Sequence, residues 1–272
     1  MGVDVPQHPS TAVWPRLVVG RVAVDLMDTD MALSLIMGAV SSPRPLAVAS
    51  ANLDHIYHFS GQGLGFTSSG PAAPGESLQW LTLLDGMPLV RKANSLSGRQ
   101  WPRLAGSDLI ALILERAGLV GAQVGFLGGM PETHRQLREE LAVHHARVHV
   151  AGTWAPSRAE LTDPQSSQGI AAEIRAAGVD ILVVGLGKPL QENWISAYGP
   201  QSGADVLLAF GAVVDFLAGR IRRAPDVVAE LGVEWAWRLM LEPRRLSRRY
   251  LVQGPRALLE LRRNAVVVDG AL

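Results

Sequence analysis

The chain has 272 residues, 48% of them apolar and 18% charged, which is enough apolar material for the core of one large α/β domain. It contains no cysteine, which excludes disulfides and thiolate metal sites and fits a reducing cytoplasm. Its 25 basic and 25 acidic residues balance overall, but eleven arginines and five acids between 219 and 263 give that segment a charge near +6, so we expect it to meet an anionic partner.

Residues 1–16 are predicted to form a loose N-terminal leader, because prolines stand at positions 6, 9 and 15. The leader lacks the basic, apolar and small-residue pattern of a signal peptide. Apolar stretches near 181–187 and 205–214 are too short to span a bilayer. Any membrane contact is therefore predicted to be peripheral.

From 17 to 218 the pattern alternates between apolar runs and amphipathic stretches, and we assign this part to a catalytic core. Apolar runs predict strands at 18–25, 45–51, 81–84, 122–127, 148–153, 181–186 and 205–211. Helices are predicted at 29–40, 108–117, 132–143, 167–177 and after Pro189, and a loop rich in Gly, Ser and Pro at 60–78. This alternation predicts an α/β fold with a Rossmann-like, largely parallel sheet and helices on both faces.

After Gly219 the alternation stops, and residues 219–272 are predicted to form a basic helical C-terminal appendage. Pro225 is expected to begin one helix, and Pro243 interrupts the next because it forces Glu242 out of helical space. The arginines could simply cover a solvated helix face. Trp235 and Trp237 argue against that alternative, since solvated faces rarely carry two indoles.

Polar residues stand where two of the predicted strands end, and they are candidates for chemistry. Ser50 and Asn52 follow one apolar run, and Asp85 follows another. A carboxylate in such a place can take a proton from a hydroxyl, and Gly86 allows backbone or substrate to approach closely. The alternative for Asp85 and Gly86 is an ordinary Asp-Gly turn, and for Ser50 and Asn52 a turn at a strand end.

Three signals for metals and cofactors are discounted. Asp28-Thr29-Asp30 has the D-x-D form of a metal site, but it opens a predicted helix, and helix capping explains it. The run VGLGKP lacks the full G-x-G-x-x-G of a nicotinamide site. His55 and His58 show no ligand spacing and are expected at the surface or behind the site. We therefore expect neither a metal nor a cofactor.

Short motifs recur in a fixed order along the chain. They are Ser50-Ala51-Asn52, Asp85-Gly86, Ala105-Gly106-Ser107-Asp108-Leu109, GLGKPLQENW at 185–194, Gly211-Ala212 with Asp215, Phe216 and Gly219, Arg223-Ala224-Pro225, Glu234-Trp235 with Arg238, Glu242-Pro243 with Arg245, and Arg248-Arg249-Tyr250. Each is weak alone, but from about residue 22 to 251 their order resembles the WecG/TagA/CpsF family of bacterial glycosyltransferases.

The resemblance implies an inverting, metal-independent hexosyltransferase of cell-envelope or exopolysaccharide biosynthesis. The expected donor is a nucleotide-diphosphate sugar, UDP-linked, and the expected acceptor is a polyprenyl-diphosphate-linked saccharide. Asp85 would be the base, with Asn52 and Gln191 orienting the sugars. Further substrate-binding residues are expected at Ser50, Gly106, Ser107, Asp108, Gly187, Glu192, Arg238, Arg245, Arg248 and Arg249.

The arginines suit this assignment because a guanidinium pairs with two phosphate oxygens. The resemblance implies that the appendage docks on the anionic inner face of the cell membrane, and it could also pack against a second copy. Nucleic-acid binding is not expected, because aromatic residues are not interleaved with the arginines on a strand platform. Ser50 replaces a family threonine and Asn94 a family arginine. These departures leave open an alternative, a non-catalytic membrane-associated scaffold of a polysaccharide assembly complex.

Overall fold

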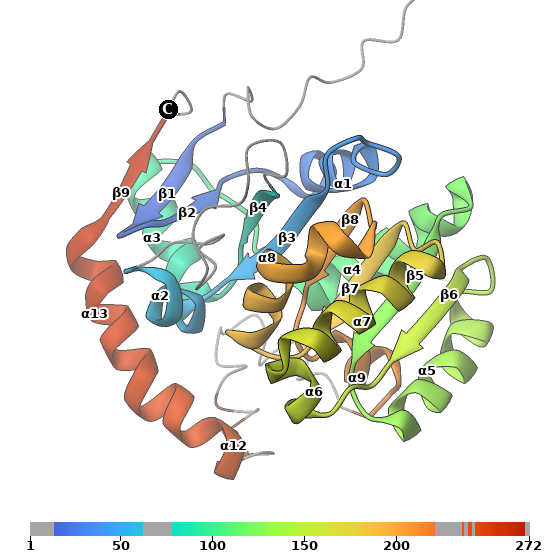
Figure 1. The fold of residues 1–272 in the computed structure, drawn as a ribbon. Helices are drawn as coiled ribbons and strands as arrows, with labels where there is room; N and C mark the ends of the chain where they lie inside the picture. The colour runs from blue at the N-terminus through green and yellow to red at the C-terminus, as the bar shows by residue number, and fades with distance from the viewer. Residues whose placement is uncertain (1–13, 62–77, 221–235, 237–238, 241–242, 270–272) are drawn as a thin grey trace, which may run out of the picture.

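The computed structural model describes residues 14–61, 78–220, 236, 239–240 and 243–269. One sheet with the strand order β6-β5-β7-β8-β3-β4-β2-β1-β9 runs through the centre of the molecule (Figure 1). Neighbouring strands from β6 to β2 are parallel, whereas β1 is antiparallel to β2 and to β9. The strands are β1 (Arg16–Val19), β2 (Val22–Asp25), β3 (Leu46–Ala51), β4 (Gln79–Leu84), β5 (Gln123–Gly128), β6 (His149–Trp154), β7 (Ile181–Gly185), β8 (Val206–Ala209) and β9 (Ala265–Val268).

Helices cover both faces of this sheet. On one face α1, α4, α5 and α9 share a core with alternate side chains of the central strands, and on the other face α7, α8, α2 and α13 do so. The helices are α1 (Thr29–Gly38), α2 (Leu53–Phe59), α3 (Met87–Ser97), α4 (Gly106–Val120), α5 (Pro131–His144), α6 (Arg158–Thr162), α7 (Pro164–Ala176), α8 (Leu190–Ser202), α9 (Val213–Leu217), α12 (Pro243–Ser247), the π-helical turn η2 (Arg248–Gln253) and α13 (Gly254–Asn264). The predicted Rossmann-like α/β fold is confirmed.

The central strands owe their position to their apolar sequences. All six residues of β3 and all four of β8 are buried, the pattern expected of parallel strands covered on both faces. Helix α1 begins where the sequence predicted a cap, because the Asp28 side chain accepts a hydrogen bond of 2.8 Å from the Met31 amide. Asp28 is thus the N-cap of α1, as the sequence predicted.

The N-terminal strand predicted at 18–25 is instead a hairpin of β1 and β2. Its turn contains Gly20, whose φ of +59° lies in the left-handed region that favours glycine. The sequence pattern did not reveal the break, because apolar residues continue on both sides of a turn of only two residues, Gly20 and Arg21.

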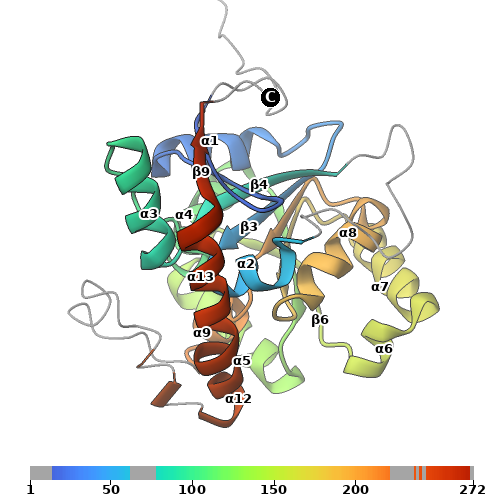
Figure 2. The same ribbon diagram turned by 90° about the vertical axis from the view of Figure 1, so that its left-hand side faces the viewer.

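The C-terminal segment also differs from its prediction as a purely helical appendage. After α13 the chain forms β9, which pairs with β1 and completes the edge of the sheet. Helix α13 runs beside α2 (Figure 2), and its Ala257 and Leu261 are buried in the same core as Ile56 of α2. The expected helix from Pro225 and the indoles of Trp235 and Trp237 lie outside the described residues.

Candidate active site

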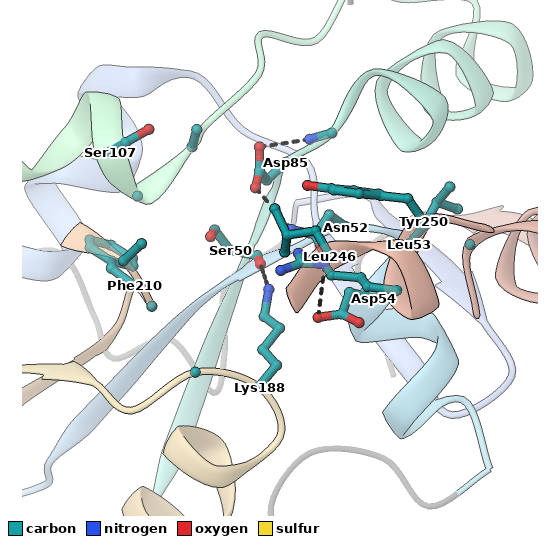
Figure 3. Close-up of a pocket in the computed structure, with 18 of the residues that line it drawn as sticks. Ser50, Asn52, Leu53, Asp54, Asp85, Ser107, Lys188, Phe210, Leu246 and Tyr250 are labelled. Carbon is teal, nitrogen blue, oxygen red and sulfur yellow. Dashed lines mark hydrogen bonds and ion pairs between the residues drawn. The ribbon is translucent and has the colours of Figure 1, made fainter. Parts of the chain in front are cut away.

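A pocket of about 490 Å³ opens at the carboxyl ends of four neighbouring strands, β7, β8, β3 and β4. In the sheet, β3 lies between β4 and β8. Along the chain β4 is the strand directly after β3, whereas β8 comes only much later. Ligands of open α/β sheets bind at such a reversal of strand order. Residues that follow each of these strands line the pocket, together with residues of α4 and of the C-terminal segment (Figure 3).

Strand register brings the predicted base and its neighbour together. Ala51 of β3 pairs with Leu84 of β4, so the next residues, Asn52 and Asp85, stand side by side. The Asn52 amide nitrogen donates to Asp85 Oδ2 at 3.3 Å. Its oxygen caps α2 by accepting from the His55 backbone amide at 3.4 Å. The cap fixes which end of the Asn52 amide faces the carboxylate.

Gly86 provides the second contact that orients Asp85. Its backbone N–H donates to Asp85 Oδ1 at 2.7 Å. Its φ is +81°, and a Cβ there would lie 3.1 Å from the Asn52 Cβ. A side chain at this position would therefore be both strained and crowded. The carboxylate of Asp85 is held by two donors from two different elements.

A lysine that the sequence analysis did not select lies in the same pocket. Lys188 follows β7, and its Nζ donates to the Ser50 backbone carbonyl at 2.8 Å. The side chain is half-buried and lines the pocket. This burial lowers the pKa of Lys188, and the nearby Glu192, Asp85 and Asp54 oppose the shift.

Gln191 of α8 is buried and lines the pocket floor, whereas the adjacent Glu192 is buried too but is not among the described residues that line the pocket. The Gln191 Oε1 accepts from the Gly187 amide at 3.1 Å, and its Nε2 donates to Glu192 Oε1 at 3.0 Å and to the Ala209 carbonyl at 2.9 Å. Both amide hydrogens are thus used inside the protein. Gln191 holds the loops after β7 and β8 in place, a different contribution from the direct sugar contact that the sequence suggested.

Beneath the floor lies His55, which is fully buried. Its Nδ1 is 3.9 Å from Glu192 Oε1, and neither ring nitrogen has a hydrogen-bond partner among the described residues. Burial, with Lys188 and His58 nearby, lowers the pKa of His55 well below its ordinary value. Burial also raises the pKa of Glu192, against the opposing effect of Lys188. Of the two expected positions for His55, at the surface or behind the site, its burial excludes the first.

The opposite wall is formed by the start of α4. Ala105, Gly106 and Ser107 line the pocket, and the N-cap of this helix makes no side-chain hydrogen bond. Arg103 also lines the pocket, and it forms an ion pair of 2.8 Å with Asp108. Asp108 itself does not line the pocket, so its place in the site is to hold Arg103.

The four predicted arginines do not share one position. Arg249 lines the pocket, and its Nε lies 3.3 Å from Asp54 Oδ2 of α2. Arg248 is exposed and does not line it. Arg238 is outside the described residues, and of Arg245 only the backbone within α12 is described.

Sequence reasoning missed Lys188, Arg103, Asp54 and Tyr250, all of which line the pocket. Lys188 had the clearest signal, because it sits inside the GLGKP run whose neighbours were selected. Asn94 lies elsewhere. It donates to Gln100 and accepts from the Trp101 amide, at 3.0 Å and 2.8 Å, and does not line the pocket.

Within the described ranges, His, Asp and Glu side chains form no group of three or more that could hold a metal ion. No helix in the same ranges is both long enough and apolar enough to cross a membrane.

A doubly covered parallel sheet, with an oriented carboxylate and several cations at its switch point, is typical of enzymes that act on phosphate-bearing donors. Comparison with protein families matches residues 17–268 to the glycosyl transferase WecG/TagA/CpsF family. The match covers nearly the whole chain, and the chain belongs to this family. It is a glycosyltransferase of cell-wall polysaccharide biosynthesis, using a nucleotide-sugar donor and a saccharide acceptor.

Proposed function

We propose that the protein is an inverting, metal-independent hexosyltransferase. It transfers a hexose-type sugar from a UDP-linked donor to a polyprenyl-diphosphate-linked saccharide. The observation that carries this proposal is the Asn52–Asp85–Gly86 arrangement, a carboxylate oriented by two donors inside the pocket. Asp85 takes the proton of the acceptor hydroxyl as that hydroxyl attacks the anomeric carbon.

The surroundings of the two pocket carboxylates support a single displacement. Among the described lining residues these carboxylates are Asp54 and Asp85, and Asp54 is ion-paired with Arg249. Asp85 has no ion-pair partner among the described residues, and its hydrogen bonds come from the neutral Asn52 and Gly86 donors. Direct attack with inversion needs one base, whereas retention through a covalent intermediate needs a separate nucleophile.

Charge around the pocket supports departure of a nucleoside diphosphate. Lys188, Arg103 and Arg249 line the pocket, and the first turn of α4 adds backbone N–H groups at its wall. Such donors stabilise the negative charge that develops as the glycosidic bond to phosphate breaks. Gln191 contributes by fixing the Gly187 backbone that precedes Lys188.

The acceptor is proposed to arrive from the inner face of the cell membrane, with the protein bound peripherally. Arg248 and the apolar Leu251 and Val252 of η2 are exposed close to the pocket residues Arg249 and Tyr250. Basic and apolar side chains together favour an anionic lipid surface.

The test is UDP release from a panel of UDP- and GDP-sugars with a short-chain polyprenyl-diphosphate saccharide as acceptor. We expect Asp85→Asn to lower turnover by about 10²- to 10⁴-fold, because the amide cannot accept the proton. The exposed helix cap Asp163→Asn should keep wild-type turnover, since asparagine also caps. NMR of the product would show an inverted anomeric centre.

Full turnover by Asp85→Asn would remove the base from this mechanism. Absence of release from every donor by wild-type protein that still binds anionic vesicles would favour the scaffold alternative. Asn94, one of the two departures that motivated that alternative, is not among the described residues that line the pocket.

A further inference from the structure

Lysine is rare in this chain, and one of its lysines, Lys188, lines the pocket. Of the 25 basic residues apart from histidine, only Lys92 and Lys188 are lysines, and the remaining 23 are arginines. Lys92 is on α3, outside the pocket, where its Nζ donates to the Arg262 carbonyl at 3.3 Å. Lys188 is the single lysine that lines the described pocket.

The cations of the pocket differ in how the protein neutralises them. Arg103 is paired with Asp108 at 2.8 Å, and Arg249 is near Asp54 at 3.3 Å. In the described part of the chain, the Lys188 ammonium has one hydrogen-bond acceptor, the Ser50 carbonyl, and no carboxylate in ion-pair contact. An ammonium carries three donors, so two remain for a ligand.

The surroundings of this ammonium fix its place. The Ser50 carbonyl belongs to the end of β3, and Asp85 follows the adjacent strand β4. In Figure 3, Ser50 lies between Lys188 and Asp85. The loop that carries Lys188 is held by the hydrogen bond between the Gly187 amide and Gln191. The positive charge therefore stands at a fixed point close to the reacting carboxylate.

We propose that Lys188 is a diphosphate-binding residue of this site, its ammonium anchored by the Ser50 carbonyl and its remaining donors directed to the phosphate oxygens of the substrate. The inference rests on the proposed function. A compact ammonium gives a point charge to phosphate, where an arginine would impose a planar fork. Burial, which lowers the pKa of Lys188, also means that a bound anion would stabilise the charged form of the side chain.

Both substrates of the proposed reaction carry a diphosphate, so the binding experiment has two arms. Calorimetry measures the affinity of wild type, Lys188→Met and the matched control Lys92→Met for UDP, and separately for geranyl diphosphate. We expect Lys188→Met to lower the affinity for one of these two ligands by about 10- to 100-fold, the range of a charge-assisted hydrogen bond. Uridine should bind all three proteins equally. Loss for UDP assigns the ammonium to the donor, and loss for geranyl diphosphate assigns it to the acceptor.

A second measurement needs no variant. Reductive methylation of the wild-type protein, read by mass spectrometry, compares Lys188 with Lys92 in the same sample. UDP or geranyl diphosphate should protect Lys188 and leave Lys92 reactive, whereas uridine should protect neither. This readout holds even if Lys188→Met disturbs folding.

The outcomes separate the two proposals. Wild-type affinity of Lys188→Met for both diphosphates, or equal methylation of Lys188 with and without them, would overturn the role of Lys188 and leave the proposed transferase intact. A wild-type protein that binds neither diphosphate would contradict the proposed function and the role of Lys188 with it.

Discussion

Gly106 gives the most direct test of how the pocket wall is packed. It begins α4, and the space where its side chain would lie is filled by the ring of Phe210, which follows β8. A Cβ on Gly106 would be 2.5 Å from Phe210 Cγ, 2.6 Å from Cδ1 and 2.9 Å from Cβ. These distances are well inside van der Waals contact. In Gly106→Ala, either the Phe210 ring moves or the first turn of α4 shifts.

The expected cost follows from this crowding. Overpacking a filled core destabilises proteins by about 1–3 kcal/mol. The helix-propensity gain of alanine over glycine, about 0.5–1 kcal/mol, offsets part of it. We expect Gly106→Ala to lose about 1–2 kcal/mol, and a chain of this size loses about 2–4 °C in Tm per kcal/mol. Because Phe210 lines the pocket, UDP affinity should fall as well.

The assay is calorimetric unfolding of Gly106→Ala beside a matched control, Gly169→Ala. Gly169 lies within α7, and nothing is within 4 Å of where its Cβ would be. Its alanine variant should therefore match or exceed wild-type stability. Phe210→Leu completes a double-mutant cycle, and in that background Gly106→Ala should cost less. An equal cost in both backgrounds would refute the assigned contact, as would a Gly106→Ala protein as stable as wild type.

Two further predictions concern buried charge. Because burial lowers the pKa of His55, and that of His58 to a lesser extent, the unfolded chain binds more protons than the folded protein below about pH 6.5. Stability should therefore fall as the pH drops below that value, by up to about 1.4 kcal/mol per pH unit for each proton. Glu192, with its raised pKa, changes stability with pH in the opposite direction. The measurement is therefore the difference between the Tm–pH curves of wild type and His55→Gln. Parallel curves would contradict the predicted effect of His55. Asp25→Asn should cost about 1–3 kcal/mol in urea unfolding, because the buried Asp25 carboxylate accepts from the Trp14 and Arg16 side chains and the Thr82 amide. Asp30→Asn, at an exposed carboxylate, should change little, and equal effects of the two would refute the buried network.

The central sheet was predictable because its strands are short, apolar and separated by helical patterns. The same regularity placed Asn52 and Asp85 at the carboxyl ends of strands, where ligands of such sheets bind. Only the structure shows that β3 and β4 are adjacent and that Asn52 therefore stands beside Asp85. The partner of β9 was not predictable, because β9 pairs with β1 across nearly the full length of the chain. Local sequence patterns carry no information about such distant pairing.

The sequence predicted where side chains lie in the site better than it predicted which contacts they make. Gln191 lines the pocket, but its amide is committed to Gly187, Glu192 and Ala209. Which donors a buried amide has left depends on the loops around it, and no spacing rule specifies these. Lys188 was not selected although its neighbours in the sequence were. Only the folded loop shows that its side chain reaches the Ser50 carbonyl.

The C-terminal segment contacts the helix whose N-cap, Asn52, orients the proposed base. This contact decides which variants can test the role of the segment. Asp54, the ion-pair partner of Arg249, is in the first turn of α2, two residues after the Asn52 cap that contacts Asp85. Helix α13 packs on the same α2, and β9 pairs with β1. Deleting the segment would therefore remove a strand of the sheet and one support of the helix that orients Asp85. Loss of activity on truncation could arise from that damage alone, so the contribution of the arginines has to be read from single substitutions in the full-length chain.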